Sequence, residues 1–238
     1  MHPRYGRRLP LSREQGLLIA SGAWLIPTLT VIVATLIHLF DQPRAIPFFI
    51  SETDQEGLQD LVFTAGLTLG GLFQMAYAWH LYHELDAVRP RIWFIAALLG
   101  ILASANTVLV SHYDMYDHIN PHILTAMLAF GGGVGWAFTA GWAMGDMATT
   151  AGKRMRKVGF AMAAAGFVVM LVAFQSAAST VDPSGLTTAE FLNQAQSGVV
   201  VAAPAEYTLV AGLMLCLASF RHELLAKEKA SSIPSLTL

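Results

Sequence analysis

The sequence predicts an all-α integral membrane protein, a bundle of six transmembrane helices. Only 13% of its 238 residues are charged, well below the share found in soluble domains, and 55% are hydrophobic. Six apolar runs also reach the length of roughly 20 residues that a helix needs to cross a bilayer. We place these runs at residues 16–40, 61–83, 92–110, 123–144, 158–178 and 199–220.

The basic residues predict the orientation of the bundle. Of the 14 Lys and Arg residues, only Arg44 falls on one side of the predicted membrane, and the others precede span 1, follow span 6 or join spans 2–3 and 4–5. Cytoplasmic loops of membrane proteins are enriched in Lys and Arg. We therefore expect both termini to be cytoplasmic, and an even number of spans agrees with this. The pattern suits a plasma membrane or an endomembrane.

The same pattern divides the chain into three parts. We expect a cytoplasmic N-terminal segment at 1–15, a transmembrane domain at 16–222 and a cytoplasmic tail at 223–238. The first apolar run is too long for the h-region of a signal peptide, and no small-residue cleavage site follows it. We interpret it as a retained span.

Composition and motifs exclude several classes of function. The net charge of -2 gives no sign of nucleic-acid binding. No nucleophile elbow, nucleotide-binding loop or zinc-protease motif is present, and the lone Cys216 cannot form an intrachain disulfide. Membrane lipids and a second membrane protein are therefore the candidate partners, and no resident cofactor is expected.

Acidic residues cluster after span 1, on the predicted outer side. The segment from Ser51 to Asp60 contains four carboxylates, those of Glu52, Asp54, Glu56 and Asp60. Thr53 and Glu56 fit a capping box at the start of the second helix, so these charges are expected to form mainly a solvated helix start. A similar pair, Thr187 and Glu190, predicts a short outer helix ending near residue 196.

Glu206 lies inside the sixth apolar run, shortly after Pro204. If the helix starts at this proline, Glu206 occupies the first turn, where its charge would meet the positive end of the helix dipole. Alternatively, Glu206 faces a polar pocket between spans, because an ionisable residue within a span is by default a candidate for a functional site.

His118 and His122 are four residues apart, a spacing at which two histidines on one helix can share a zinc ion, and Asp114 is a third candidate ligand. However, Pro121 disfavours helical dihedrals at the residue before it. We therefore expect His118 to precede the helix and His122 to lie in its first turn, so a hydrogen-bonded polar cap is favoured over a divalent-metal site.

Three short motifs follow one another along the predicted outer side. Their sequences are Ile46-Pro-Phe-Phe-Ile-Ser-Glu-Thr53, His122-x-x-x-Ala-x-x-x-Phe-x-x-Gly133 and Ala205-Glu-Tyr207. Together they resemble the DRAM family, the damage-regulated autophagy modulators with their GPI-lipid-remodelling and FGF-receptor-activating relatives. The resemblance implies six spans, cytoplasmic termini and a role in membrane lipid handling or trafficking. The chain departs from the family pattern by its two phenylalanines after Pro47 and by Tyr207, where tryptophan is frequent.

These observations lead to three functional hypotheses. The favoured one is a non-catalytic protein whose outer polar cap contacts lipid headgroups or a partner through Ser51, Glu52, His122, Glu206 and Tyr207. The second is a membrane-embedded lipid hydrolase or acyl-transfer enzyme, with or without a divalent metal, in which His122 or Glu206 acts as general base. The third is a small-solute carrier, with a path lined by Gln74, Asn106 and Gln175.

Overall fold

The computed structural model describes residues 12–231 of the chain. The predicted N-terminal segment and tail therefore lie partly outside the described residues, as do Arg4, Arg7 and Arg8. Six long helices run through the described part: α1 (Arg13–Phe40), α2 (Leu58–Glu84), α3 (Pro90–Val110), α4 (Ile119–Met144), α5 (Thr150–Ala178) and α7 (Gln196–Ser219). All six are long and apolar enough to cross a membrane, which confirms the six predicted spans.

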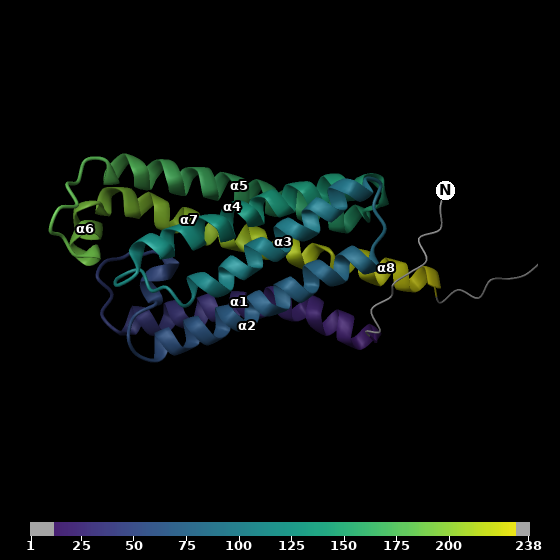
Figure 1. The fold of residues 1–238 in the computed structure, drawn as a ribbon, viewed down its shortest axis with the longest axis horizontal. Helices are drawn as coiled ribbons and strands as arrows, with labels where there is room; N and C mark the ends of the chain where they lie inside the picture. The colour runs from purple at the N-terminus through teal and green to yellow at the C-terminus, as the bar shows by residue number, and fades with distance from the viewer. Residues whose placement is uncertain (1–11, 232–238) are drawn as a thin grey trace, which may run out of the picture.

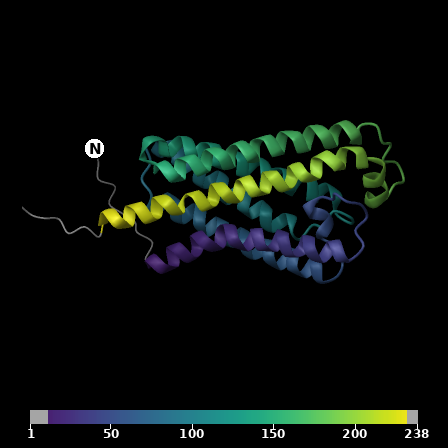
Figure 2. The same cartoon turned by 180° about the vertical axis from the view of Figure 1, so that it is seen from behind.

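Four shorter elements complete the fold. They are the 3₁₀ helices η1 (Ile50–Thr53) and η2 (Gly145–Met147), the short helix α6 (Thr188–Gln194) and the terminal helix α8 (Arg221–Ser231). The predicted short helix near residues 187–196 is thus confirmed, and both bonds of its Thr187–Glu190 capping box are present. Helix α8 continues the direction of α7 beyond the end of the bundle (Figure 2).

The helices form an elongated bundle with two distinct ends (Figure 1). We call the end that carries the connections 41–57, 111–118 and 179–195 the distal end, and the opposite end, where α1 begins and α8 lies, the proximal end. Helices α1, α2, α3 and α4 pack in sequence order, each against the next, whereas α5 packs mainly against α7. Helix α7 also contacts α1 and α4, and it thereby closes the bundle.

The close approach of α5 and α7 depends on glycines in both helices. A Cβ atom added to Gly212 would come within 2.5 Å of the Gly159 carbonyl oxygen and of the Ala163 amide nitrogen. One added to Gly166 would come within 2.6 Å of the Ala205 carbonyl oxygen. Small residues let helix backbones approach closely in lipid, where the association of helices depends on packing. These glycines therefore make α5 and α7 a tight pair on one side of the bundle.

The structure corrects two predicted helix starts. Thr53 and Glu56 do not cap α2: Thr53 Oγ1 donates instead to the Ile50 carbonyl at 2.7 Å, within η1, and α2 begins after Gly57, whose φ of 134° favours glycine. Helix α7 begins at Gln196, about two turns before Pro204. Glu206 therefore lies in the middle of a helix and not in its first turn, so the predicted dipole interaction does not apply.

A buried ion pair joins α5 to α8 at the proximal end. Arg156 Nη2 lies 2.6 Å from Glu223 Oε1, and less than a tenth of each side chain is exposed. Arg156 Nη1 also donates to Ser219 Oγ at 3.1 Å, and the guanidinium lies over the Phe220 ring, 4.1 Å from its centroid. The same Glu223 oxygen accepts from the Thr149 amide just before α5. This one carboxylate thus ties three segments of the proximal end together.

Candidate functional site

A cavity of about 120 Å³ lies between the helices of the bundle. Residues of η1 and of α1, α2, α3, α4 and α7 line it, and α5 does not contribute. Its lining runs along α7 from Glu206 to Leu217, about 16 Å at 1.5 Å per residue. Most of the lining residues are aliphatic or aromatic. Such a lining offers few polar partners to buried water molecules, each of which needs two to four. The cavity therefore suits an elongated apolar group better than a column of water.

Some polar residues of the cavity already form hydrogen bonds within the bundle, and others lie at one end of the cavity. Toward its middle, Gln74 Nε2 donates to the Ala23 carbonyl at 3.1 Å, and Ser104 and Thr107 each donate to a carbonyl of their own helix. These groups serve the packing of helices. At the distal end of the cavity lie Ser51, His122 and Glu206. The cavity thus has an apolar body and one polar end.

The orientation of the His122 ring follows from a single hydrogen bond. Nδ1 lies 2.5 Å from the Tyr113 carbonyl oxygen, which can only accept. Nδ1 must therefore carry the proton, and in the neutral ring Nε2 is left as an acceptor. His122 is 5% exposed and contributes to the lining of the cavity. It can accept a hydrogen bond, or a proton, from a polar group at the distal end of the cavity.

Glu206 is held by the segment that closes the distal end. The Ile50 amide donates to Glu206 Oε2 at 2.7 Å, although the two residues are 156 positions apart. Glu206 lies about ten residues into α7, so η1 must lie inside the distal end of the bundle to form this hydrogen bond. Phe48 packs edge-on against His38 of α1, and Phe49 against Phe174 of α5. The segment 48–54, which we call the distal plug, therefore covers the polar end of the cavity.

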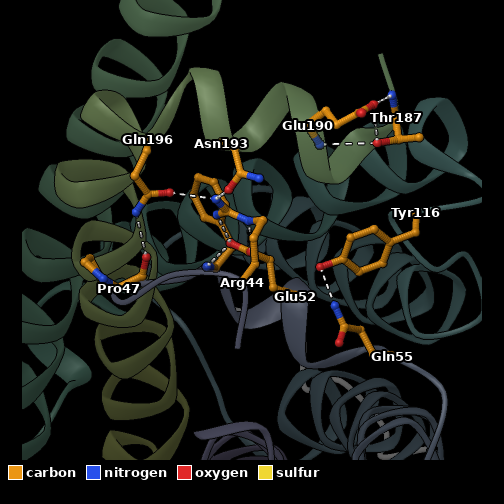
Figure 3. Close-up of polar contacts among 10 residues, drawn as sticks. Arg44, Pro47, Glu52, Gln55, Tyr116, Thr187, Glu190, Asn193 and Gln196 are labelled. Atoms are coloured by element: carbon orange, nitrogen blue, oxygen red, sulfur yellow. Dashed lines mark hydrogen bonds and ion pairs between the residues drawn. The ribbon is translucent and has the colours of Figure 1, made fainter. Parts of the chain in front are cut away.

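A buried ion pair anchors the distal plug. Arg44 Nε donates to Glu52 Oε2 at 2.9 Å and Nη2 donates to Oε1 at 3.2 Å, while the Phe49 amide donates to Oε1 at 2.9 Å. Arg44 Nη1 also donates to Asn193 Oδ1 at 2.9 Å and to Gln196 Oε1 at 2.8 Å. Figure 3 shows Arg44 between Glu52 and the two amide side chains. Arg44, the only Lys or Arg of the distal end within residues 12–231, thus connects the plug to α6 and to the start of α7.

The predicted solvated helix start is wrong for two of its four carboxylates. The Glu52 side chain is fully buried, and Asp54 is 5% exposed. Burial of the Asp54 carboxyl, together with the negative charges of Asp60 and Asp114, raises its pKa to about 8. Glu52 keeps both oxygens on Arg44 and on the Phe49 amide. It therefore holds the plug in place, and its full burial leaves no surface for the predicted contact with lipid or a partner.

The three predicted metal ligands do not form one site. His118 Nδ1 pairs with Asp114 Oδ2 at 2.9 Å on the exposed surface, whereas His122 turns toward Tyr113 and the cavity. His118 precedes α4 as its N-cap residue and His122 lies in its first turn, as expected. The expected effect of Pro121 on the residue before it is wrong, because α4 begins at Ile119 and includes Asn120. Within residues 12–231, no group of three His, Cys, Asp or Glu side chains is placed to hold a metal ion.

Comparison with known proteins places the chain in a family. Residues 16–227 match the model of the Frag1/DRAM/Sfk1/Cwh43P N-terminal domain. The chain belongs to this family. No curated protein and no solved structure was found to match it. The family membership confirms the DRAM-type resemblance seen in the sequence and agrees with six spans.

Other predicted residues of this Frag1/DRAM-family protein lie away from the polar end of the cavity. The Tyr207 hydroxyl is 3.1 Å from Thr35 Oγ1, at the contact between α7 and α1. Of the three residues proposed to line a carrier path, Gln74 lines the cavity, Asn106 is buried and donates to the Leu102 carbonyl of its own helix, and Gln175 is exposed on α5. They do not share one path.

Asp54 should make the stability of this Frag1/DRAM-family protein depend on pH. An aspartate in an unfolded chain has a pKa near 3.9, so between about pH 4 and 8 the folded protein holds a proton that the unfolded chain releases. Stability contributed by this group is therefore lost as the pH rises through that window. We expect Tm to fall from pH 5 to 8, and Asp54→Asn to reduce this fall.

Thermal unfolding in detergent, followed by circular dichroism, measures the effect. Asp146→Asn removes the same charge from an exposed side chain at the proximal end and is the matched control. An unchanged pH dependence in Asp54→Asn, equal to that of the control, would show that Asp54 does not hold the proton.

Proposed function

We propose that this protein binds a membrane lipid, with an acyl chain in the central cavity and the polar part of the lipid at Ser51, His122 and Glu206. The observation that carries the proposal is the division of the cavity into an apolar body and one polar end. Burial of an acyl chain contributes about 0.8 kcal/mol for each CH₂ removed from water. The polar end would then select the depth and direction of the bound lipid. This function fits the predicted role in membrane lipid handling.

The charge distribution supports an orientation for this function. Apart from Arg44, the Lys and Arg residues of the described helices and loops lie toward the proximal end. By the positive-inside rule the proximal end would face the cytoplasm. The distal plug and the polar end of the cavity would then face the outer leaflet, the leaflet from which lipid would enter.

A cavity-filling variant tests the proposal. Ala126 of α4 lines the cavity, so we expect Ala126→Phe to reduce the lipid that copurifies with the protein by about tenfold, since overpacking a site costs about 1–3 kcal/mol. Leu128→Phe adds a ring to a membrane-facing position of the same helix and is the matched control. Lipid extraction from purified protein, followed by mass spectrometry, gives the measurement. Equal lipid content in wild type and Ala126→Phe would contradict the proposal.

The arrangement of His122 supports hydrolysis or acyl transfer as a second candidate. With its Nε2 free to accept a proton, His122 could activate a water molecule or the Ser51 hydroxyl for attack on a lipid ester. The same mass spectrometry distinguishes the two functions. Intact lipid in the purified protein supports binding, whereas a fatty acid released from added lipid, and lost in His122→Asn, supports catalysis.

A further inference from the structure

The distal end carries a second hollow, separate from the central cavity. It has a volume of about 520 Å³ and lies between the start of α2 and the connection from α3 to α4. We call it the acidic hollow. Its lining consists of Asp54, Gln55, Glu56, Asp60, Thr64, Ser111, His112, Asp114, Tyr116 and Asp117. Five of these residues are carboxylates and none is Lys or Arg, so the acidic hollow favours a positively charged ligand.

One carboxyl oxygen of the acidic hollow is left without a hydrogen-bond partner. Asp54 is 5% exposed, and its Oδ2 has no hydrogen-bond partner within residues 12–231. Buried polar atoms are nearly always paired in native proteins, because an unpaired one costs free energy. Burial and the negative charges of Asp60 and Asp114 keep Asp54 protonated near neutral pH while the acidic hollow is empty. A ligand that donates hydrogen bonds and carries positive charge would favour release of this proton and would pair with the Asp54 carboxylate.

An apolar groove begins where the acidic hollow ends. This α2 groove has a volume of about 380 Å³, is formed mainly by α2, and shares Asp60, Thr64 and His112 with the hollow. Its other lining residues are Leu61, Ala65, Thr68, Leu69 and Leu72. The three leucines are between 47% and 63% exposed, on a helix long enough to cross the membrane. The α2 groove would therefore face the lipid hydrocarbon, with the acidic hollow at its distal end.

We propose that the acidic hollow and the α2 groove bind one lipid whose headgroup carries an ammonium group. The ammonium group would lie among the carboxylates near Asp54 and Asp60, and an acyl chain would follow the groove along Leu69 and Leu72. Where the two meet, Thr68 Oγ1 lies 3.0 Å from His112 Nε2. These two side chains place hydrogen-bonding groups between the proposed ammonium site and the groove, where the phosphate ester of the bound lipid would lie.

The spread of the carboxylates favours an ammonium group over a metal ion. No three His, Cys, Asp or Glu side chains within residues 12–231 are placed to ligate one metal, and a calcium ion takes six to eight oxygen ligands at 2.3–2.6 Å. An ammonium group has several N–H donors that point in different directions and can engage carboxylates that do not converge on one point. The size of the hollow agrees with an organic headgroup.

Native mass spectrometry of the full-length protein in detergent tests the proposal. The probes are phosphatidylethanolamine, which carries an ammonium group, and phosphatidylglycerol with the same acyl chains, which does not. We expect the wild type to prefer the ethanolamine lipid by about tenfold, the effect of about one charge-assisted hydrogen bond. The double variant Asp54→Asn/Asp60→Asn should lose this preference, because asparagine keeps the shape of the site but not its charge.

Three further variants make the outcome specific. Asp182→Asn removes a distal carboxylate outside the hollow and should keep the preference. Ala65→Trp fills the α2 groove and should weaken binding of both lipids alike. Ala126→Phe, which fills the central cavity, should leave the preference unchanged. The lipid site on α2 and the lipid site in the central cavity can therefore be confirmed or rejected independently of each other.

Three results would overturn the proposal. One is a wild type that binds both lipids equally. The other is a preference that survives in Asp54→Asn/Asp60→Asn while the melting temperature of this variant matches that of the wild type. The third is calcium that binds in calorimetry and that also displaces the ethanolamine lipid when it is added in the native mass spectrometry, which would assign the acidic hollow to a metal ion.

Discussion

Arg44→Met is expected to lower the free energy of unfolding by about 3–5 kcal/mol, the usual result of removing one partner from a buried ion pair. The substitution leaves the fully buried Glu52 carboxylate without its cation. It also removes two hydrogen bonds, to Asn193 and Gln196, that join the distal plug to α6 and α7. For a chain of this size the change corresponds to a fall in Tm of roughly 10 °C.

Thermal unfolding in detergent measures the effect of Arg44→Met. Arg221→Met removes the same charge from an exposed position and should leave Tm nearly unchanged. The double variant Arg44→Met/Glu52→Gln should recover part of the loss, because a neutral amide costs less to bury than an unpaired carboxylate. A single variant as stable as the control would mean that the ion pair does not hold the plug.

Arg156→Met should cost a similar amount, about 3–5 kcal/mol, at the opposite end of the bundle. Glu223, whose side chain is 3% exposed, would lose its cation at 2.6 Å. The contact of the guanidinium with the Phe220 ring would also be lost, a contribution of about 0.5–2 kcal/mol for cation–π pairs. The loss should destabilise the attachment of α8 and of the start of α5.

Arg154→Met provides the matched control for Arg156→Met, because Arg154 is exposed on the same helix. Arg156→Lys should recover only part of the stability, since an ammonium group is a point charge and cannot bond Glu223 and Ser219 with the fixed geometry of a guanidinium. If Arg156→Met and Arg154→Met melt at the same temperature, the buried pair contributes little.

Local sequence signals predicted the spans well because each depends on neighbouring residues alone. Hydropathy and length placed all six spans, and the Thr187–Glu190 capping box placed α6. The same kind of signal failed at Thr53 and Glu56, where the chain forms η1 in place of a capped helix start. A capping pattern specifies a local preference, and the burial of Phe48, Phe49 and Ile50 in the bundle outweighs it.

The sequence contained one unused signal for the distal plug. Arg44 is the single basic residue on its side of the predicted membrane, and four carboxylates follow it within 16 residues. A lone cation beside a buried acid is the arrangement that makes burial of the acid tolerable. The pattern could have suggested an ion pair, but it could not select Glu52 from the four, because that choice depends on which carboxylate turns into the bundle.

Helix α7 shows a similar limit. Pro204 suggested a helix start because proline lacks an amide donor, yet α7 continues through it. In a membrane protein, neighbouring helices can compensate the interruption that a proline causes. Here the helix pairs closely with α5 on both sides of Pro204, through Gly198 and Gly212. Glu206 consequently lies within a helix, at the polar end of a cavity, and not at a helix start.

The sequence by itself determined that this is a six-span membrane protein of the Frag1/DRAM type, with all but one of its Lys and Arg residues on one side of the predicted membrane and with His122 and Glu206 as its most notable polar residues. Hydropathy, chain length and charge are properties of short segments, so they can be obtained without coordinates. Only the tertiary structure decided that Ser51, His122 and Glu206 line one cavity and that Glu52 is buried beneath Arg44. Those facts depend on contacts between residues far apart in the chain, whose geometry is set by how the helices pack.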